Sequence, residues 1–189
     1  MTKTTVVIPN YNGIQYIDEC LHSLCQGTRM PEIILVDNGS GDGSRELVRE
    51  KYKEVQVIEF AQNTGFSSAV NAGIRAAVTE YVILLNNDTV VDREFVENLE
   101  KALSEEPGAF SAGAKMLQMA APERLDGAGD LYCALGWAFS RGKDRPCEAY
   151  DKPCRIFSAC AGAAIYRRQA FDRIGFFDEN HFAYLEDTD

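Results

Sequence analysis

The sequence predicts an α/β protein with a mostly parallel sheet and helices on both faces. Short apolar runs such as Thr5–Ile8 and Ile33–Val36 are typical of strands that are buried on both faces. Segments with apolar residues at helical spacing lie between these runs, and the alternation continues through the first 115 residues. Polar, often glycine-containing segments follow each apolar run, as expected at the ligand-binding edge of such a sheet.

Each expected element has its own signal along the chain. The expected strands are short and apolar or alternating, at residues 5–8, 33–36, 55–60 and 82–85. The expected helices lie at residues 14–24, 44–52, 66–78 and 93–103; the third is rich in alanine, and the others have apolar residues on one face. Residues 118–155, which contain several glycines and prolines, are expected to form a long irregular loop. A strand at 161–166 and a helix at 168–174 should follow.

Composition limits the classes of function. A length of 189 residues suits one domain, and a hydrophobic content of 46 % is ordinary for a globular protein. The net charge is −10, from 29 acidic and 19 basic side chains, which argues against nucleic-acid binding driven by phosphate contacts. The sequence shows neither a signal peptide nor an apolar stretch long enough to cross a membrane, so a soluble, cytoplasmic chain is expected.

The six cysteines are expected to be free thiols. They form no C-x-x-C pair, and only two histidines are present, which argues against a structural zinc site. Reduced thiols are the favoured interpretation for a cytosolic protein, with a bond between Cys147 and Cys154 as the alternative.

The segment "YVILLNNDTV" places a carboxylate directly after a buried strand. Asp88 there could bind a hard divalent cation, since Mg²⁺ typically uses one or two carboxylates together with substrate phosphates. Asn86 and Asn87 would add acceptor oxygens without adding negative charge. The alternative is a turn that caps the next helix.

Two other strand ends carry candidate ligand-binding residues. Asp37 is followed by a G-x-G-x-G run, which is not the dinucleotide fingerprint, and it could accept a hydrogen bond from a base or ribose. Gly65 precedes an expected helix whose N-terminus could bind phosphate. Asn71 and Arg75 share one face of that helix, and Arg75 is interpreted either as a phosphate ligand or as a surface arginine.

An acidic pair near the end of the sequence, Glu186 and Asp187, follows an aromatic-rich segment. If the chain returns to the same sheet edge there, one of these carboxylates could act as a general base on a hydroxyl. The alternative is a solvated helix end.

In this order the segments resemble glycosyltransferase family 2, which has the A-type, Rossmann-like nucleotide-diphospho-sugar transferase fold. Four stretches show the resemblance: "VVIPNYNG", "IILVDNGSGDGS", "NTGFSSAVNAGIRAA" with "YVILLNNDTVV", and "CAGAAIYRRQAFDRIGFFDENHFAYLEDTD". Within the family the chain is most similar to the rhamnosyltransferase-like bacterial branch.

The resemblance implies transfer of a sugar from a nucleoside-diphosphate donor, UDP- or dTDP-linked, to a glycan or lipid-linked acceptor. It implies inversion at the anomeric carbon and a requirement for Mg²⁺ or Mn²⁺. Residues that match the family's donor-binding positions are Pro9, Asn10, Tyr11, Asp37 (at the base), Gly65, Asn71, Asn86 and Asn87. Asp88 matches the metal ligand, Asp187 the catalytic base and Glu186 its supporting acid.

The chain departs from the family pattern at two places. Asn86 replaces the first acid of the D-x-D motif, and the sequence ends at Asp189, whereas the family continues further. We therefore expect one catalytic domain, incomplete at its C-terminus, with a nucleotide-sugar half at 1–115 and an acceptor and catalytic half at 116–189. Such a chain should bind donor but turn over poorly, and any membrane association should depend on regions outside it. The alternatives are a non-catalytic nucleotide-sugar-binding or scaffold module and a sugar-nucleotide pyrophosphorylase.

Overall fold

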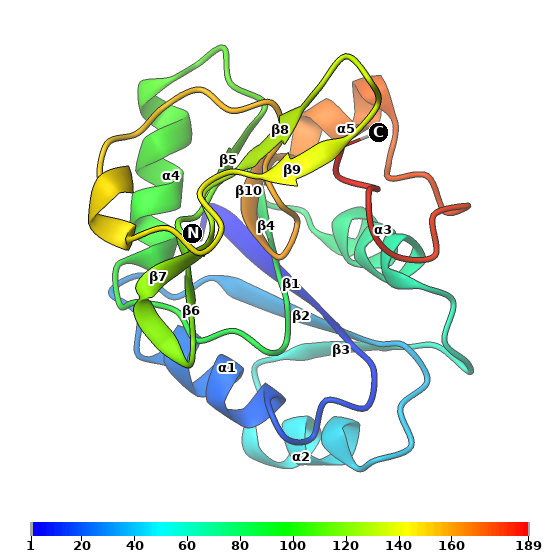
Figure 1. The fold of residues 1–189 in the computed structure, drawn as a ribbon. Coiled ribbons are helices and arrows are strands. Elements are labelled where there is room, and N and C mark those ends of the chain that lie inside the picture. Colours follow the sequence, from blue (N-terminus) through cyan, green and yellow to red (C-terminus); the bar gives the residue numbers. More distant parts are fainter. Residues whose placement is uncertain (1, 189) are drawn as a thin grey trace.

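A computed structural model of the protein describes residues 2–188 and is built on one six-stranded sheet (Figure 1). The strand order is β3-β2-β1-β4-β10-β5, and β1 to β4 are parallel. The strands of this sheet are β1 (Thr4–Asn10), β2 (Glu32–Asp37), β3 (Gln56–Glu59), β4 (Tyr81–Leu85), β5 (Ser111–Gly113) and β10 (Ala163–Arg167). The boundaries of the parallel strands lie within two residues of the expected ones.

Helices cover both faces of the sheet, which confirms the predicted fold class. One face packs against α1 (Ile17–Cys25), α2 (Ser44–Lys51) and α4 (Phe95–Glu105). The other face packs against α3 (Phe66–Ala76) and α5 (Arg168–Ile174). Figure 1 shows α3 and α5 on one side of the sheet and α1, α2 and α4 on the other.

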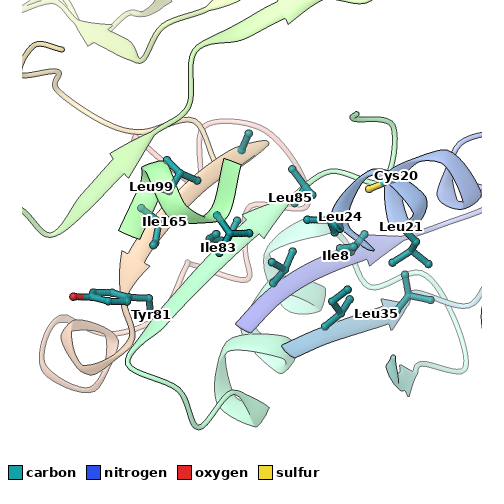
Figure 2. Packing of buried hydrophobic residues seen from close by; sticks show 14 of the residues in the cluster. Ile8, Cys20, Leu21, Leu24, Leu35, Tyr81, Ile83, Leu85, Leu99 and Ile165 are labelled. Atoms are coloured by element: carbon teal, nitrogen blue, oxygen red, sulfur yellow. The ribbon is translucent and has the colours of Figure 1, made fainter. Parts of the chain in front are cut away.

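The two cores follow from strand periodicity. In β4, Ile83 and Leu85 face the α1/α4 layer while Val82 and Leu84 face α3, because successive side chains point to opposite faces. Figure 2 shows the first of these cores, with Ile8 and Leu24 packed beside Leu85. Since both faces are covered, the strands read as continuous apolar runs.

The direction of β10 decides where the later part of the chain lies. β10 runs antiparallel to β4, with Ala163 opposite Leu85. The residues that precede β10 therefore lie beside the carboxyl end of β4, and the Asn86 N–H donates to the Gly162 carbonyl at 2.9 Å. The residues just before β10 thus lie at the edge that holds the polar loops of the first half.

The expected long irregular loop at 118–155 is wrong, because this segment contains short strands. Two antiparallel pairs are present, β6 (Met116–Gln118) with β7 (Ala121–Gly127) and β8 (Asp130–Tyr132) with β9 (Ala138–Ser140), followed by the 3-10 turn η1 (Cys147–Tyr150). Most of their side chains are at least partly exposed, so these strands have no apolar run to mark them.

Two further expectations concern thiols and membrane spans. All six cysteines are free, so Cys147 and Cys154 are not bonded. Within residues 2–188, no helix combines the length and apolar character that a membrane crossing requires.

Candidate active site

A pocket of about 280 Å³ opens where β1 and β4 end. It brings together most of the residues that the sequence assigned to the donor and the metal: Pro9, Asn10, Tyr11, Gly65, Asn86, Asn87 and Asp88. Its lining also includes residues that were not assigned to the donor: Asn38, Asn63, Phe66, Phe182 and Ala183. Asp37 and Asn71 are not part of the lining.

A hydrogen-bonded pair of asparagines joins the ends of β1 and β4. Asn87 Nδ2 donates to Asn10 Oδ1 at 2.8 Å. Asn10 is buried, and its Nδ2 donates to Ser44 Oγ at 2.9 Å and to Asp37 Oδ1 at 3.2 Å. Gly13 leaves room for this pair, because a Cβ there would lie 2.1 Å from Asn87 Nδ2.

Asp37 lies beneath the pocket rather than on its surface. Its side chain is fully buried, and it accepts hydrogen bonds from Asn10 and from the Ser40 N–H at 3.2 Å. Arg45 lies 3.8 Å from its second oxygen. This placement suits Asp37 to hold Asn10 in position, and its contact with a nucleotide base stays a prediction.

Two backbone N–H groups at and just before the start of α3 donate to other parts of the chain. The Phe66 N–H donates to the Phe182 carbonyl at 2.6 Å, and the Thr64 N–H donates to Asn38 Oδ1 at 2.9 Å. Gly65 has φ +92°, and a Cβ there would lie 2.5 Å from the Phe182 carbonyl oxygen. The first N–H of the helix thus binds the Phe182 carbonyl, and Gly65 permits that close approach.

Asn71 and Arg75 hold the aromatic-rich segment against α3. The buried Asn71 side chain donates to the Phe177 carbonyl at 2.8 Å and accepts from the Phe177 N–H at 3.1 Å. Arg75 pairs with Glu179 at 3.3 Å, which agrees with the surface interpretation. Both residues act away from the pocket lining.

Asp88 offers a carboxylate at the pocket mouth. The side chain is exposed and has no hydrogen-bond or ion-pair partner among residues 2–188. Since Asn87 uses its nitrogen in the bond to Asn10, its amide oxygen is left as an acceptor beside Asp88. An all-oxygen set with one carboxylate fits a hard cation such as Mg²⁺ or Mn²⁺.

Asp187 reaches the same edge through the residues before β10. Its Oδ2 accepts a hydrogen bond from the Ala161 N–H at 3.0 Å, and Gly162, the next residue, binds Asn86. Asp187 also forms a group with Asp130 and Cys160, in which one potential ligand atom from each side chain lies within 4.8 Å of the others.

The model of glycosyl transferase family 2 matches residues 5–175 of this chain. The chain belongs to this family. The curated relatives include an N-acetylglucosaminyl-diphospho-decaprenol L-rhamnosyltransferase of Mycobacterium tuberculosis, 27 % identical over 97 % of this chain and 67 % of the relative. A poly(ribitol-phosphate) beta-glucosyltransferase of Bacillus spizizenii is 39 % identical over 49 % of this chain and 16 % of its own length.

Solved structures agree on the fold. Residues 1–349 of S. aureus TarS superpose with a TM-score of 0.70 at 21 % identity, over 98 % of this chain and 53 % of that one. The mannosyltransferase PcManGT from Pyrobaculum calidifontis, solved with GDP-Man and Mn²⁺, superposes with a TM-score of 0.69 at 19 % identity, over 94 % and 48 %. The chain thus spans about half the length of these solved proteins.

Burial shifts the pKa values of several side chains around Asp187 in this family 2 domain. Burial raises the pKa of the Cys160 thiol to about 11, so without a bound metal the thiol remains protonated near neutral pH. Burial, and then the charge of Asp187, raises the pKa of Asp130 to about 6. Burial also raises the pKa of Glu186, whose Oε2 lacks a hydrogen-bond partner among the described residues.

Sequence reasoning did not identify Asp130 or Gly13 as site residues. Asp130 meets Asp187 only through tertiary structure, and nothing near it in the sequence marks it as a site residue. Gly13 directly follows the "IPNYN" segment, so the presence of a glycine at that point was an available signal.

The raised pKa of Asp130 predicts a pH-dependent effect on stability. In the unfolded chain the carboxyl should titrate near its ordinary value of 3.8, and in the folded protein near 6. The unfolded state therefore loses its proton first as the pH rises, and the free energy of unfolding falls between about pH 4 and pH 6. Asp130→Asn should remove this fall and stabilise the protein at pH 7 by roughly 1 kcal/mol, after allowance for solvent screening.

Urea unfolding of both proteins at pH 4 and pH 7 checks this expectation. The difference in unfolding free energy should be present at pH 7 and small at pH 4. Equal stability of the two proteins at pH 7 would contradict it.

Proposed function

We propose that this chain is a glycosyltransferase catalytic domain that moves a sugar from a nucleoside-diphosphate donor to a hydroxyl acceptor with inversion. The observation that carries the proposal is the convergence of two distant motifs on one sheet edge. Asn86 lines the pocket together with Asp88, and its backbone N–H donates to the Gly162 carbonyl. The N–H of the preceding residue, Ala161, donates to the Asp187 carboxylate. A donor pocket and a candidate base are thereby held by adjacent residues of one strand end.

In this proposal the pocket binds the nucleoside and the diphosphate. Tyr11 is half exposed at the pocket wall, so its ring is available to stack on a base. Pro9, Asn10 and Gly65 shape the same wall. Asp37 and Asn71, which are buried, position Asn10 and the segment at Phe177 respectively.

Asp88, with the amide oxygens of Asn86 and Asn87, would hold Mg²⁺ or Mn²⁺ against the donor diphosphate. The bound ion would act as a Lewis acid that offsets charge on the departing nucleoside diphosphate. PcManGT was solved with GDP-Man and Mn²⁺, and TarS with UDP-GlcNAc, which supports the use of a nucleotide-sugar donor.

Asp187 would accept the proton of the attacking hydroxyl. The Ala161 N–H holds one carboxylate oxygen, which leaves the other oxygen available for the acceptor. Glu186 would support the base from the adjacent position. A base on the face opposite to the leaving group produces a single displacement, and inversion follows from that layout.

The relatives suggest the biological setting. Their names describe a decaprenol-linked and a poly(ribitol-phosphate) acceptor, so we propose a role in bacterial polysaccharide or cell-envelope glycan synthesis. A UDP- or dTDP-linked donor, a glycan or lipid-linked acceptor and a cytoplasmic location complete the proposal. The two-part organisation, with donor binding in 1–115 and acceptor chemistry in 116–189, is part of it.

Isothermal titration with a panel of nucleoside diphosphates, with and without Mn²⁺, tests donor binding. We expect one nucleotide to bind in a metal-dependent manner, and Asp88→Ala to weaken that binding roughly tenfold or more, about 1.4 kcal/mol for each factor of ten. Asp92→Ala is the matched control, because it removes an exposed carboxylate a few residues away that does not line the pocket.

The possible results separate the candidate functions. Metal-dependent binding that is lost only in Asp88→Ala supports the transferase. Absence of binding for every nucleotide would refute the proposal and favour a scaffold module.

A further inference from the structure

Two aromatic side chains in the second half of the chain form an exposed stack. The rings of Tyr132 and Phe157 have centroids 5.2 Å apart and planes inclined by 17°. Tyr132 is 48 % exposed and Phe157 is 60 % exposed. Aromatic pairs of this kind usually contribute to a core, so a stack that leaves so much surface in solvent suggests a binding surface.

Backbone pairing places this stack beside the Asp187 group. The Phe157 N–H donates to the Asp130 carbonyl at 3.1 Å, and the Asp130 N–H donates to the Ser158 carbonyl at 2.9 Å. Tyr132 lies two residues after Asp130 in β8, so both side chains point to the same face of that strand. Asp130 belongs to the group that contains Asp187. Asp130 thus connects the Tyr132–Phe157 stack to Asp187, the candidate base.

We propose that Tyr132 and Phe157 bind the sugar ring of the acceptor and present its hydroxyl to Asp187. This inference rests on the proposed function, and it assigns the acceptor-binding surface that the donor pocket does not provide.

A sugar ring fits the chemistry of this surface better than other ligands do. A pyranose has an apolar C–H face, which can pack on an aromatic ring, and a rim of hydroxyls, which can donate to Asp130 and Asp187. An alkyl chain would lie beside these carboxylates without giving them a hydrogen-bond donor. A phosphate group would be repelled by their negative charge.

Binding of methyl glycosides tests the inference without knowledge of the natural acceptor. Methyl glycosides of glucose, galactose, rhamnose and N-acetylglucosamine are titrated into the full-length protein and followed by NMR, with Mn²⁺-free buffer to avoid line broadening. At least one should bind, and Tyr132→Ala and Phe157→Ala should each weaken it about tenfold. Tyr132→Leu, which keeps apolar bulk without an aromatic face, should weaken it as well.

Phe139→Ala is the matched control. Phe139 is 49 % exposed and pairs with Leu131 in the same hairpin, so its side chain points to the face opposite to Tyr132. The Phe139→Ala variant should therefore bind the glycosides as the wild type does. Circular dichroism of each variant checks that the hairpin mutants remain folded.

The outcomes separate this inference from the proposed function. Nucleotide affinity should be the same in all these variants, since the stack is not part of the donor pocket. Equal glycoside binding by wild type and both alanine variants would overturn the inference, as would an equal loss in Phe139→Ala or failure of every glycoside to bind the wild type. Failure of the wild-type protein to bind any nucleotide would instead refute the proposed transferase function.

Discussion

Asp187→Asn should reduce the rate of sugar transfer by about 10²–10⁴, the usual contribution of a general base. The asparagine has the same shape, and its amide oxygen can still accept the Ala161 N–H that now binds Asp187 at 3.0 Å. It cannot accept a proton from a hydroxyl. The local structure and the donor pocket should therefore remain intact while the chemical step fails.

The measurement compares the rate of product formation with donor affinity in the full-length protein. Nucleotide affinity should stay near that of the wild type, because Asp187 does not line the donor pocket. Asp172→Asn is the control, since it changes an exposed aspartate of α5 that pairs with Arg168 at 2.8 Å. Transfer by Asp187→Asn at the wild-type rate would show that another group is the base.

Gly13→Ala should disrupt the donor pocket although it adds only one methyl group. The new Cβ would lie 2.1 Å from Asn87 Nδ2 and 2.3 Å from Asn10 Oδ1, the two atoms that bond to each other across the pocket floor. Asn10 is buried and bonded to Asp37, so it cannot move without breaking further hydrogen bonds. Loss of a buried bond of this kind costs about 1–3 kcal/mol.

We expect lower unfolding free energy and at least about tenfold weaker nucleotide binding for Gly13→Ala. Gly41→Ala is a closely matched control in a neighbouring loop, because a Cβ there meets no atom within 4 Å. Urea unfolding and isothermal titration measure the two effects. If Gly13→Ala and Gly41→Ala behaved alike, the Asn10–Asn87 pair would not organise the pocket.

Sequence reasoning predicted the strand-and-helix half of the fold well because its signals are local. The buried strand at Val82–Leu85 is apolar on both faces, and its boundaries could be read within a few residues of sequence. The short strands β8 and β9 were missed, since half-exposed three-residue strands are stabilised by partners elsewhere in the chain and show no apolar run of their own.

The residues of the candidate site likewise divide into those that local sequence marks and those that only the tertiary structure brings together. Asn86, Asn87 and Asp88 were found because polar residues directly after a buried strand stand out in the sequence. Asp37 was placed at the correct sheet edge, yet the sequence could not reveal that its side chain is buried under Asn10. Asp130 had no signal, because its importance depends on a carboxylate from a distant segment.

Local patterns in the sequence predict the order of strands and helices from β1 to α4, the family, and the segments that carry amides and carboxylates, since each of these depends on neighbouring residues. Only the packing of distant segments shows which of those side chains reach the pocket, which lie beneath it, and that Asp130 lies beside Asp187. Asp130 and Asp187 meet there because β10 runs antiparallel beside β4. That direction brings late residues to the carboxyl edge of the parallel strands, and no local pattern in the sequence specifies it.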